Sequence, residues 1–181
     1  MRENVTVPVS FARLLGMSDL HVRTEPIRID APAGLVWQVL TDVERYGEWN
    51  PFTPQVRTDF RIGSPAHLLV NMGPAKVRIA ETVSAFEEPR LIAWGKTFGA
   101  RWLLAAVREQ HLEPVSETSC RYHNTDRLTG LLAPLVLLCA GGYMRVGFTD
   151  VGEGLKRQSE ALFKSSKPRP WRSEPRPPAS T

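Results

Sequence analysis

The sequence predicts an α+β fold in which a long C-terminal helix covers one face of an antiparallel sheet. Between residues 143 and 164, apolar side chains recur at three- and four-residue steps or their sum, namely at Met144, Phe148, Val151, Leu155 and Leu162. This is the period of an amphipathic helix. Residues 54–130 instead contain short runs rich in β-branched, aromatic and leucine residues, separated by turn signals. A sheet that presents one apolar face needs a cover, and the C-terminal helix supplies it.

Composition predicts one globular domain with extensions at both ends. The chain has 181 residues, of which 42% are hydrophobic and 23% charged. Most of the formal net charge of +4 lies in a proline- and arginine-rich C-terminal segment, so the body is nearly neutral and we expect no nucleic-acid partner. We expect an N-terminal arm over residues 1–21, a ligand-binding domain over 22–166 and a disordered tail over 167–181.

Cysteine usage and hydropathy predict a cytoplasmic protein without a membrane span. Cys120 and Cys139 are far apart and form no disulfide framework, which favours a reducing compartment. The longest apolar run, residues 131–142, is shorter than the roughly 20 residues that cross a bilayer. Cys120 and His123 would lie on opposite faces of a strand, so we expect no metal site. With no nucleotide-binding glycine motif either, we expect no cofactor.

The first part of the predicted domain is a strand followed by two short helices. Residues 22–29 include Pro26, which suits an edge strand. Asp30 is a candidate N-cap, with Pro32 near the first helical position, for a helix of about ten residues. A second short helix follows Asp42 and ends before Pro51.

Six further strands are predicted between this helix pair and the C-terminal helix, which makes seven in total. They cover residues 55–60, 66–72, 75–86, 91–97, 101–112 and 119–129. Glycine- and proline-containing turns separate them, as an antiparallel meander requires. In the C-terminal helix, Gly147, Gly152 and Gly154 each cost roughly 1 kcal/mol relative to alanine, so they indicate either a bend or space left for a cavity.

Four segments together resemble a known superfamily. They are Ile-Asp-Ala-Pro-Ala-Gly-Leu-Val-Trp-Gln-Val-Leu-Thr-Asp at residues 29–42, Tyr-Gly-Glu-Trp-Asn-Pro-Phe at 46–52, Leu-Glu-Pro at 112–114 and Thr-Gly-Leu-Leu-Ala-Pro at 129–134. In this order, over roughly residues 22–164, they resemble the polyketide cyclase/dehydrase-like branch of the START-related (SRPBCC, Bet v 1-like) superfamily. The resemblance implies a helix-grip fold, in which a seven-stranded antiparallel sheet wraps the C-terminal helix and leaves a ligand cavity between them. It implies no particular reaction, because members include lipid carriers, hormone binders and cyclases.

Strand alternation predicts which side chains face this cavity. The inward set is Trp102, Leu104, Ala106, Arg108, Gln110 and Leu112 on one strand, Cys120, Tyr122, Asn124, Asp126 and Leu128 on the next, and Val77, Ile79, Glu81 and Val83 with Ile92 and Trp94 further across. Several members are polar or charged, and burying them without partners would cost several kcal/mol. Either they line a polar pocket, or register shifts place some of them in solvent. In the first case, we expect Arg108 to be mostly buried and paired with Asp126 or Glu81.

The candidate ligand-binding residues lie on this face of the sheet and among the aromatic residues near the expected entrance. Aromatic residues are nevertheless more often part of the hydrophobic core than ligand contacts. In the resembling family the end of the helix pair flanks the entrance, where Asn50 is either a turn former or a ligand contact. The candidates are Trp49, Asn50, Phe52, Trp94, Trp102, Gln110, Tyr122, Asn124 and Phe148.

Two main classes of function remain open at this point. The first is a carrier or sensor for a small hydrophobic molecule that is polyketide-, lipid- or isoprenoid-like. The second is a cofactor-independent cyclase or dehydratase, in which Asp126 or Glu81 abstracts a proton and Arg108 stabilises an enolate oxygen. A third, weaker alternative is an interaction module whose cavity is vestigial.

Overall fold

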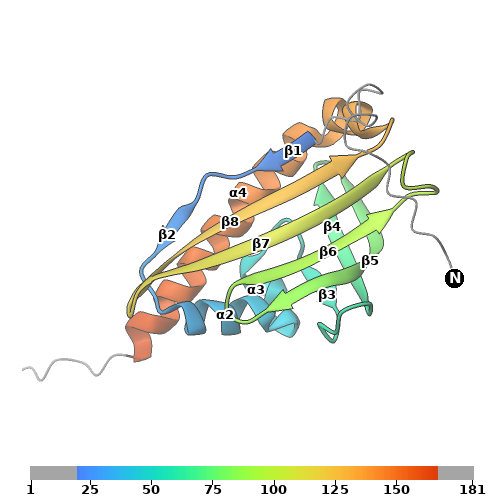
Figure 1. Cartoon of the computed structure of the whole chain (residues 1–181). Coiled ribbons are helices and arrows are strands. Elements are labelled where there is room, and N and C mark those ends of the chain that lie inside the picture. The colour runs from blue at the N-terminus through green and yellow to red at the C-terminus, as the bar shows by residue number, and fades with distance from the viewer. Residues whose placement is uncertain (1–19, 167–181) are drawn as a thin grey trace, which may run out of the picture.

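The computed structural model describes residues 20–166 (Figure 1). In chain order the elements are β1 (Leu20–Arg23), β2 (Ile27–Ile29), α2 (Ala33–Thr41), the 3₁₀ turn η1 (Val43–Arg45), α3 (Tyr46–Trp49), β3 (Gln55–Arg57), β4 (Pro65–Met72), β5 (Ala75–Glu87), β6 (Leu91–Thr97), β7 (Ala105–Ser116), β8 (Ser119–Thr129) and α4 (Ala133–Ser166). The predicted C-terminal tail and nearly all of the predicted N-terminal arm lie outside the described residues.

The strands form one antiparallel sheet in the order β1-β8-β7-β6-β5-β4-β3, with β2 also paired to β8. The predicted first strand is therefore two short strands along the same edge, and the sheet has eight strands. The interruption includes Pro26, which has no N–H to give to a ladder. The predicted meander of six strands is confirmed.

The long helix α4 runs along one face of the sheet (Figure 1). It packs its predicted apolar side chains, Met144, Phe148, Val151 and Leu155, into the core. It begins about ten residues earlier than its amphipathic period indicates, because the apolar run from residue 131 continues into it. Pro134 is compatible with this start, since the first turn of a helix needs no N–H donor there. Within residues 20–166 no helix is long and apolar enough to cross a membrane.

The two predicted short helices are confirmed, but the expected cap is wrong. Pro32 occupies the N-cap position of α2, without a side-chain hydrogen bond. Asp30 instead accepts a hydrogen bond from Arg28 at 2.9 Å. Burial of Trp37 in the core attaches α2 to the rest of the domain, and the Tyr46 hydroxyl donates to the Leu40 carbonyl at 2.7 Å to join α3 to α2.

Strand β7 is displaced from its predicted position, which corrects the expectation for Trp102. The strand begins at Ala105, and Trp102 lies in the preceding turn with 59% of its surface exposed. The carbonyls of Trp102 and Leu103 accept hydrogen bonds from the Leu131 and Leu132 N–H groups at 3.0 Å. They hold the start of α4 instead of extending the ladder, so Trp102 does not face the interior.

Candidate ligand-binding site

A row of polar residues crosses the concave face of the sheet. The register of β6, β7 and β8 places Trp94 opposite Arg108 and Arg108 opposite Asp126. We call these three residues the central row. All three are buried, with exposed fractions of 1%, 8% and 8%. The inward alternation predicted for β8 is confirmed, and the alternative in which these groups slip into solvent is wrong for the central row.

The Arg108 guanidinium is held mainly by neutral groups. It donates to the Thr53 hydroxyl and to the Asn124 side-chain oxygen, each at 3.4 Å. It also lies 4.6 Å from the centre of the Phe148 ring and 5.8 Å from that of Phe52, as a cation–π pair does.

The expected ion pair between Arg108 and a carboxylate is not formed. Among the described residues no carboxylate oxygen lies within 4.0 Å of its nitrogens, although Asp126 is directly opposite across the ladder. Alternation predicts a shared face but not the direction in which a long side chain extends, and this one extends over the aromatic rings.

The central row has hydrogen-bonding groups without partners. Trp94 Nε1, Arg108 Nε and Asp126 Oδ1 are each buried and make no hydrogen bond within the described part of the chain. Leaving such a group unsatisfied costs about 1–3 kcal/mol, so each calls for an explanation, such as a bound molecule or an ordered water. Two donors and one acceptor without partners therefore lie at paired positions of adjacent strands.

Two carboxyl groups beside Arg108 have pKa values near neutrality. Burial raises the pKa of Asp126 to about 6, and the Arg108 charge opposes this rise. Burial, followed by the charge of Asp126, raises the pKa of Glu81 to about 7, against the effect of Arg108 and Lys96. Glu81 is half-buried on β5. Both groups can therefore exchange protons at physiological pH.

Other predicted site residues are engaged in internal contacts. The Tyr122 hydroxyl donates to Gln110 at 2.8 Å, and burial raises the pKa of Tyr122 to about 12. Asn124 Nδ2 donates to the Phe148 carbonyl at 3.4 Å. Asn50 Oδ1 accepts the Thr53 N–H at 2.7 Å, so Asn50 is a turn former.

Thr53 is the residue that sequence reasoning missed. It is buried and contacts Arg108, but it lies outside any strand or helix, where no period indicates its orientation. The Asn50 turn that positions it is the signal that could have found it.

On the opposite face of the sheet, two histidines form a stacked pair. His123 and His111 have parallel rings with centres 4.6 Å apart. Cys120 is buried on the interior side, so the predicted separation of Cys120 and His123 agrees with the register. No group of three or more potential metal ligands is present among residues 20–166.

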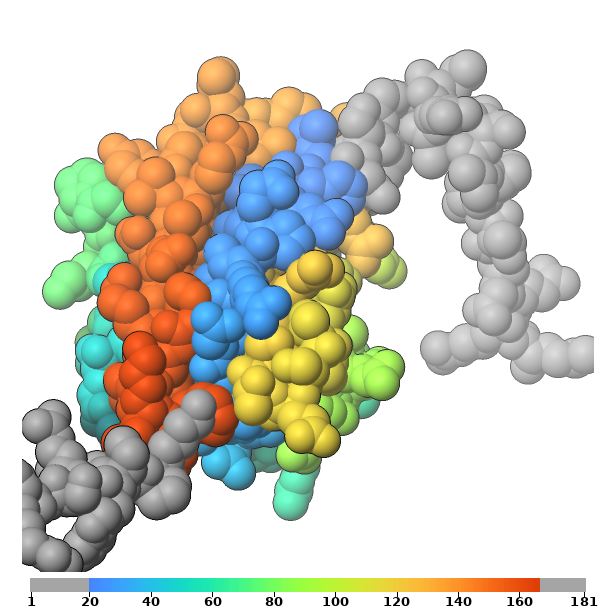
Figure 2. Space-filling model, turned by 90° about the vertical axis from the view of Figure 1, so that its left-hand side faces the viewer, coloured from blue at the N-terminus to red at the C-terminus, as the bar shows by residue number. Residues whose placement is uncertain are grey.

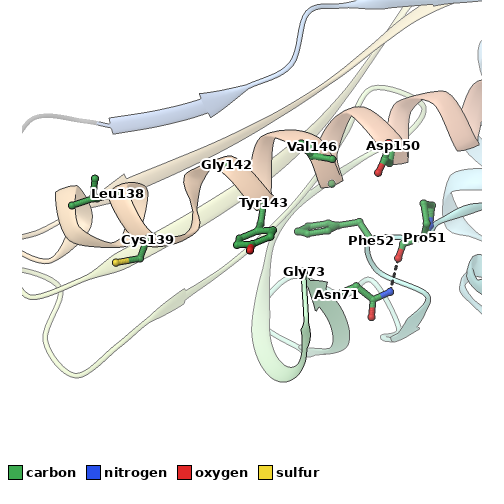
Figure 3. Close-up of a pocket in the computed structure, with 11 residues that line it drawn as sticks. Pro51, Phe52, Asn71, Gly73, Leu138, Cys139, Gly142, Tyr143, Val146 and Asp150 are labelled. Carbon is green, nitrogen blue, oxygen red and sulfur yellow. Dashed lines mark hydrogen bonds between the residues drawn. The ribbon is translucent and has the colours of Figure 1, made fainter.

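A groove of about 630 Å³ opens between α4 and the segments that face it (Figure 3). One wall comes from α4, and the other from Pro51, Phe52, Asn71 and the β4–β5 turn. We call it the apolar groove. A second opening of about 460 Å³ lies on the other side of α4, against the connection between β1 and β2. The first volume is typical of pockets for small molecules.

Two phenylalanines stand between these openings and Arg108. Phe52 lines the apolar groove and Phe148 lines the second opening. Their rings meet edge to face at 5.4 Å, and both contact the guanidinium. Trp49, by contrast, packs its ring against Tyr46 at 4.9 Å as part of the core.

An antiparallel sheet that wraps a long C-terminal helix, with two short helices after the first edge, is a helix-grip α+β fold. Residues 21–160 match the family described as polyketide cyclase / dehydrase and lipid transport, and the chain belongs to this family. None of the curated proteins matches the sequence.

Solved structures show the same fold at low sequence identity. The Zhui aromatase/cyclase from Streptomyces sp. R1128 is 19% identical, with a TM-score of 0.61 over 79% of this chain and 94% of that one. A START superfamily protein from Mycobacterium smegmatis is 18% identical, with a TM-score of 0.59 over 78% and 98%. Norcoclaurine synthase from Thalictrum flavum, in complex with dopamine and hydroxybenzaldehyde, is 10% identical, with a TM-score of 0.61 over 93% and 100%.

Proposed function

We propose that residues 22–166 bind a small, largely apolar molecule that carries a carbonyl or hydroxyl oxygen, between the sheet and α4, as a carrier or sensor. The observation that carries this proposal is the unmet hydrogen bonding of the central row. The indole N–H of Trp94 and the Nε–H of Arg108 can donate to a ligand oxygen, and Asp126 can accept from a hydroxyl. A polyketide-, lipid- or isoprenoid-like molecule has this combination of an apolar body and few oxygens.

The apolar groove is the proposed route to the central row. Phe52 borders the groove and also contacts Phe148 and the Arg108 guanidinium. Turning the Phe52 ring would join the groove to the buried polar groups, and the two aromatic rings would then flank the apolar body of the ligand. This accounts for a site with a mostly apolar lining and a few convergent polar groups.

A cyclase or dehydratase is the second candidate, favoured by the pKa values of the two carboxyls. A general base works best when its pKa lies near the operating pH, and Asp126 at about 6 and Glu81 at about 7 meet this condition. Arg108 is placed to stabilise negative charge that develops on a substrate oxygen. Such an enzyme would act on a polyketide-like substrate by general acid/base catalysis without a cofactor.

The Arg108→Leu variant tests the site. The ligand of the wild-type protein should be identified first, by native mass spectrometry of the purified full-length chain and by extraction of any molecule that co-purifies with it. We expect the variant to bind this molecule at least tenfold more weakly, because losing a hydrogen bond from a charged donor costs about 1.5–3 kcal/mol. Arg121→Leu, which alters an exposed arginine on the same sheet, is the matched control and should leave affinity unchanged. Equal affinity in all three proteins would remove the polar site.

A second readout separates the two candidate functions. In an enzyme, Asp126→Asn or Glu81→Gln would abolish loss of water from a poly-β-carbonyl compound while binding of that compound persists. In a carrier, the wild-type protein would bind the same compound and return it unchanged. Mass spectrometry of the reaction mixture distinguishes these outcomes.

A further inference from the structure

The first half of α4 is apolar on its outer face as well as its inner one. Leu135, Leu138 and Val146, with Leu131 just before the helix, are 55%, 83%, 63% and 61% exposed. The spacing of Leu135, Leu138 and Val146 places them on one side of the helix, and Leu131 lies in the turn that leads into it. We call these four residues the leucine stripe.

Across the helix from the stripe, Met144 and Phe148 face the core. A helix that is apolar all round is normally covered on every side. A contiguous exposed apolar surface of this kind marks an interaction site.

The chain before β1 approaches the stripe. Leu20 pairs with Leu128, so the chain that enters β1 comes from the end of the sheet where β8 leads through Gly130 into α4. β1 contacts α4, and Figure 2 shows β1 and the first half of α4 side by side at the surface. Three residues of extended chain span roughly 10 Å, about two turns of helix. The residues just before Leu20 are therefore within reach of the stripe from Leu131 to Leu138.

That sequence carries an apolar face of matching size. Residues 10–17 read Ser-Phe-Ala-Arg-Leu-Leu-Gly-Met, with Phe11, Leu14 and Leu15 at the spacing of one helical face. Eight residues of helix are about 12 Å long, similar to the distance along α4 from Leu131 to Leu138. We propose that residues 10–17 of this chain cover the leucine stripe.

This cover would also border the proposed ligand entrance. Leu138 and Val146 of the stripe line the apolar groove themselves, as does the exposed Cys139 that follows Leu138. Residues seated on the stripe would therefore contact part of the α4 wall of the groove. The inference concerns only the N-terminal segment and stands whether or not the groove admits a ligand.

A double-mutant cycle in the full-length chain tests the contact. Leu14→Asp and Leu138→Asp should each increase the equilibrium constant for unfolding. If the two residues are in contact, their effects are coupled. The increase in the double variant should then be at least about fivefold smaller than the product of the two single increases. Ile62→Asp, at an apolar residue that is 72% exposed in a turn outside the stripe, is the control. Its effect should combine independently with that of Leu14→Asp.

Alkylation of Cys139 by a maleimide gives a second, independent readout. The Phe11→Asp/Leu14→Asp variant should react severalfold faster than the wild type, because the cover has been loosened, while buried Cys120 stays unreactive. Independent effects of Leu14→Asp and Leu138→Asp together with an unchanged alkylation rate would overturn the proposal. The proposal would also be overturned if the full-length chain bound phospholipid vesicles through the stripe, or formed a dimer through it, and Leu138→Asp abolished that binding or that dimer.

Discussion

Replacing Gly154 with alanine is expected to destabilise the domain by roughly 3 kcal/mol or more, the upper range for overpacking a core. A Cβ at this position would overlap the backbone carbonyl oxygen of Trp49. A backbone atom cannot rotate aside as the end of a side chain can, so α3 and α4 would have to separate. The buried contacts around Trp49 and Leu155 would be lost with that movement.

Gly142→Ala in the same helix is the matched control for this prediction. A Cβ there meets no atom within 4 Å, so the change should stabilise the protein by up to about 1 kcal/mol through helix propensity alone. Equilibrium unfolding in urea measures both variants. A Gly154→Ala protein as stable as the wild type would show that α4 does not need this close approach.

Glu81 and Asp126 are expected to lower the stability of the wild-type domain as the pH rises from about 4.5 to about 7, whereas His123, whose pKa burial lowers, acts in the opposite direction below about pH 6.5. Glu81 has a pKa of about 7 in the folded state, against 4.5 in the unfolded reference. Between these values the folded state holds the proton more tightly than the unfolded state, so raising the pH favours unfolding. Asp126, with a pKa of about 6 against 3.8, acts in the same direction. The Glu81 contribution is at most about 3 kcal/mol, because the side chain is half-buried.

Glu81→Gln should therefore be more stable than the wild type at pH 8 and should flatten the decline with pH. Unfolding in urea at pH 5, 6, 7 and 8 gives the comparison. Glu117→Gln, at an exposed position in the β7–β8 turn, is the control and should follow the wild-type curve. Other carboxylates, at Asp30, Glu48, Asp59 and Glu160, have lowered pKa values and affect stability only at more acidic pH. An unchanged slope in Glu81→Gln would mean that Glu81 is not held protonated by its surroundings.

Strand alternation predicted the interior of β8 correctly because this strand is regular over eleven residues. The same rule failed at Trp102, where the backbone bonds to the start of α4, a long-range contact that local pattern does not show. The early start of α4 was missed for a related reason, since a segment that is apolar all round has no helical period to detect.

Three of the glycines of α4, Gly147, Gly152 and Gly154, illustrate what the sequence leaves open. Their cost in a helix indicated a bend or space for a ligand. In the structure, a Cβ at Gly147 would meet the Phe52 ring and one at Gly154 would meet the Trp49 backbone, so both permit close packing of α4. Two of the three also border an opening, since Gly147 lines the apolar groove and Gly152 lines the second opening. Which neighbour approaches a glycine depends on tertiary packing, as does the position of the Arg108 head group among Thr53, Asn124 and the aromatic rings.

Both edges of the sheet are formed by short strands, β3 at one edge and the interrupted pair β1 and β2 at the other. In the interruption, the Thr24 N–H donates to the Asn124 carbonyl, and the Asn124 N–H donates to the Thr24 hydroxyl, each at 3.0 Å. The backbone N–H and carbonyl of Asn124 are thus satisfied even where no strand pairs with β8. Such edges give an incoming strand from another molecule little free backbone to pair with, which protects a β-rich protein against aggregation by strand addition.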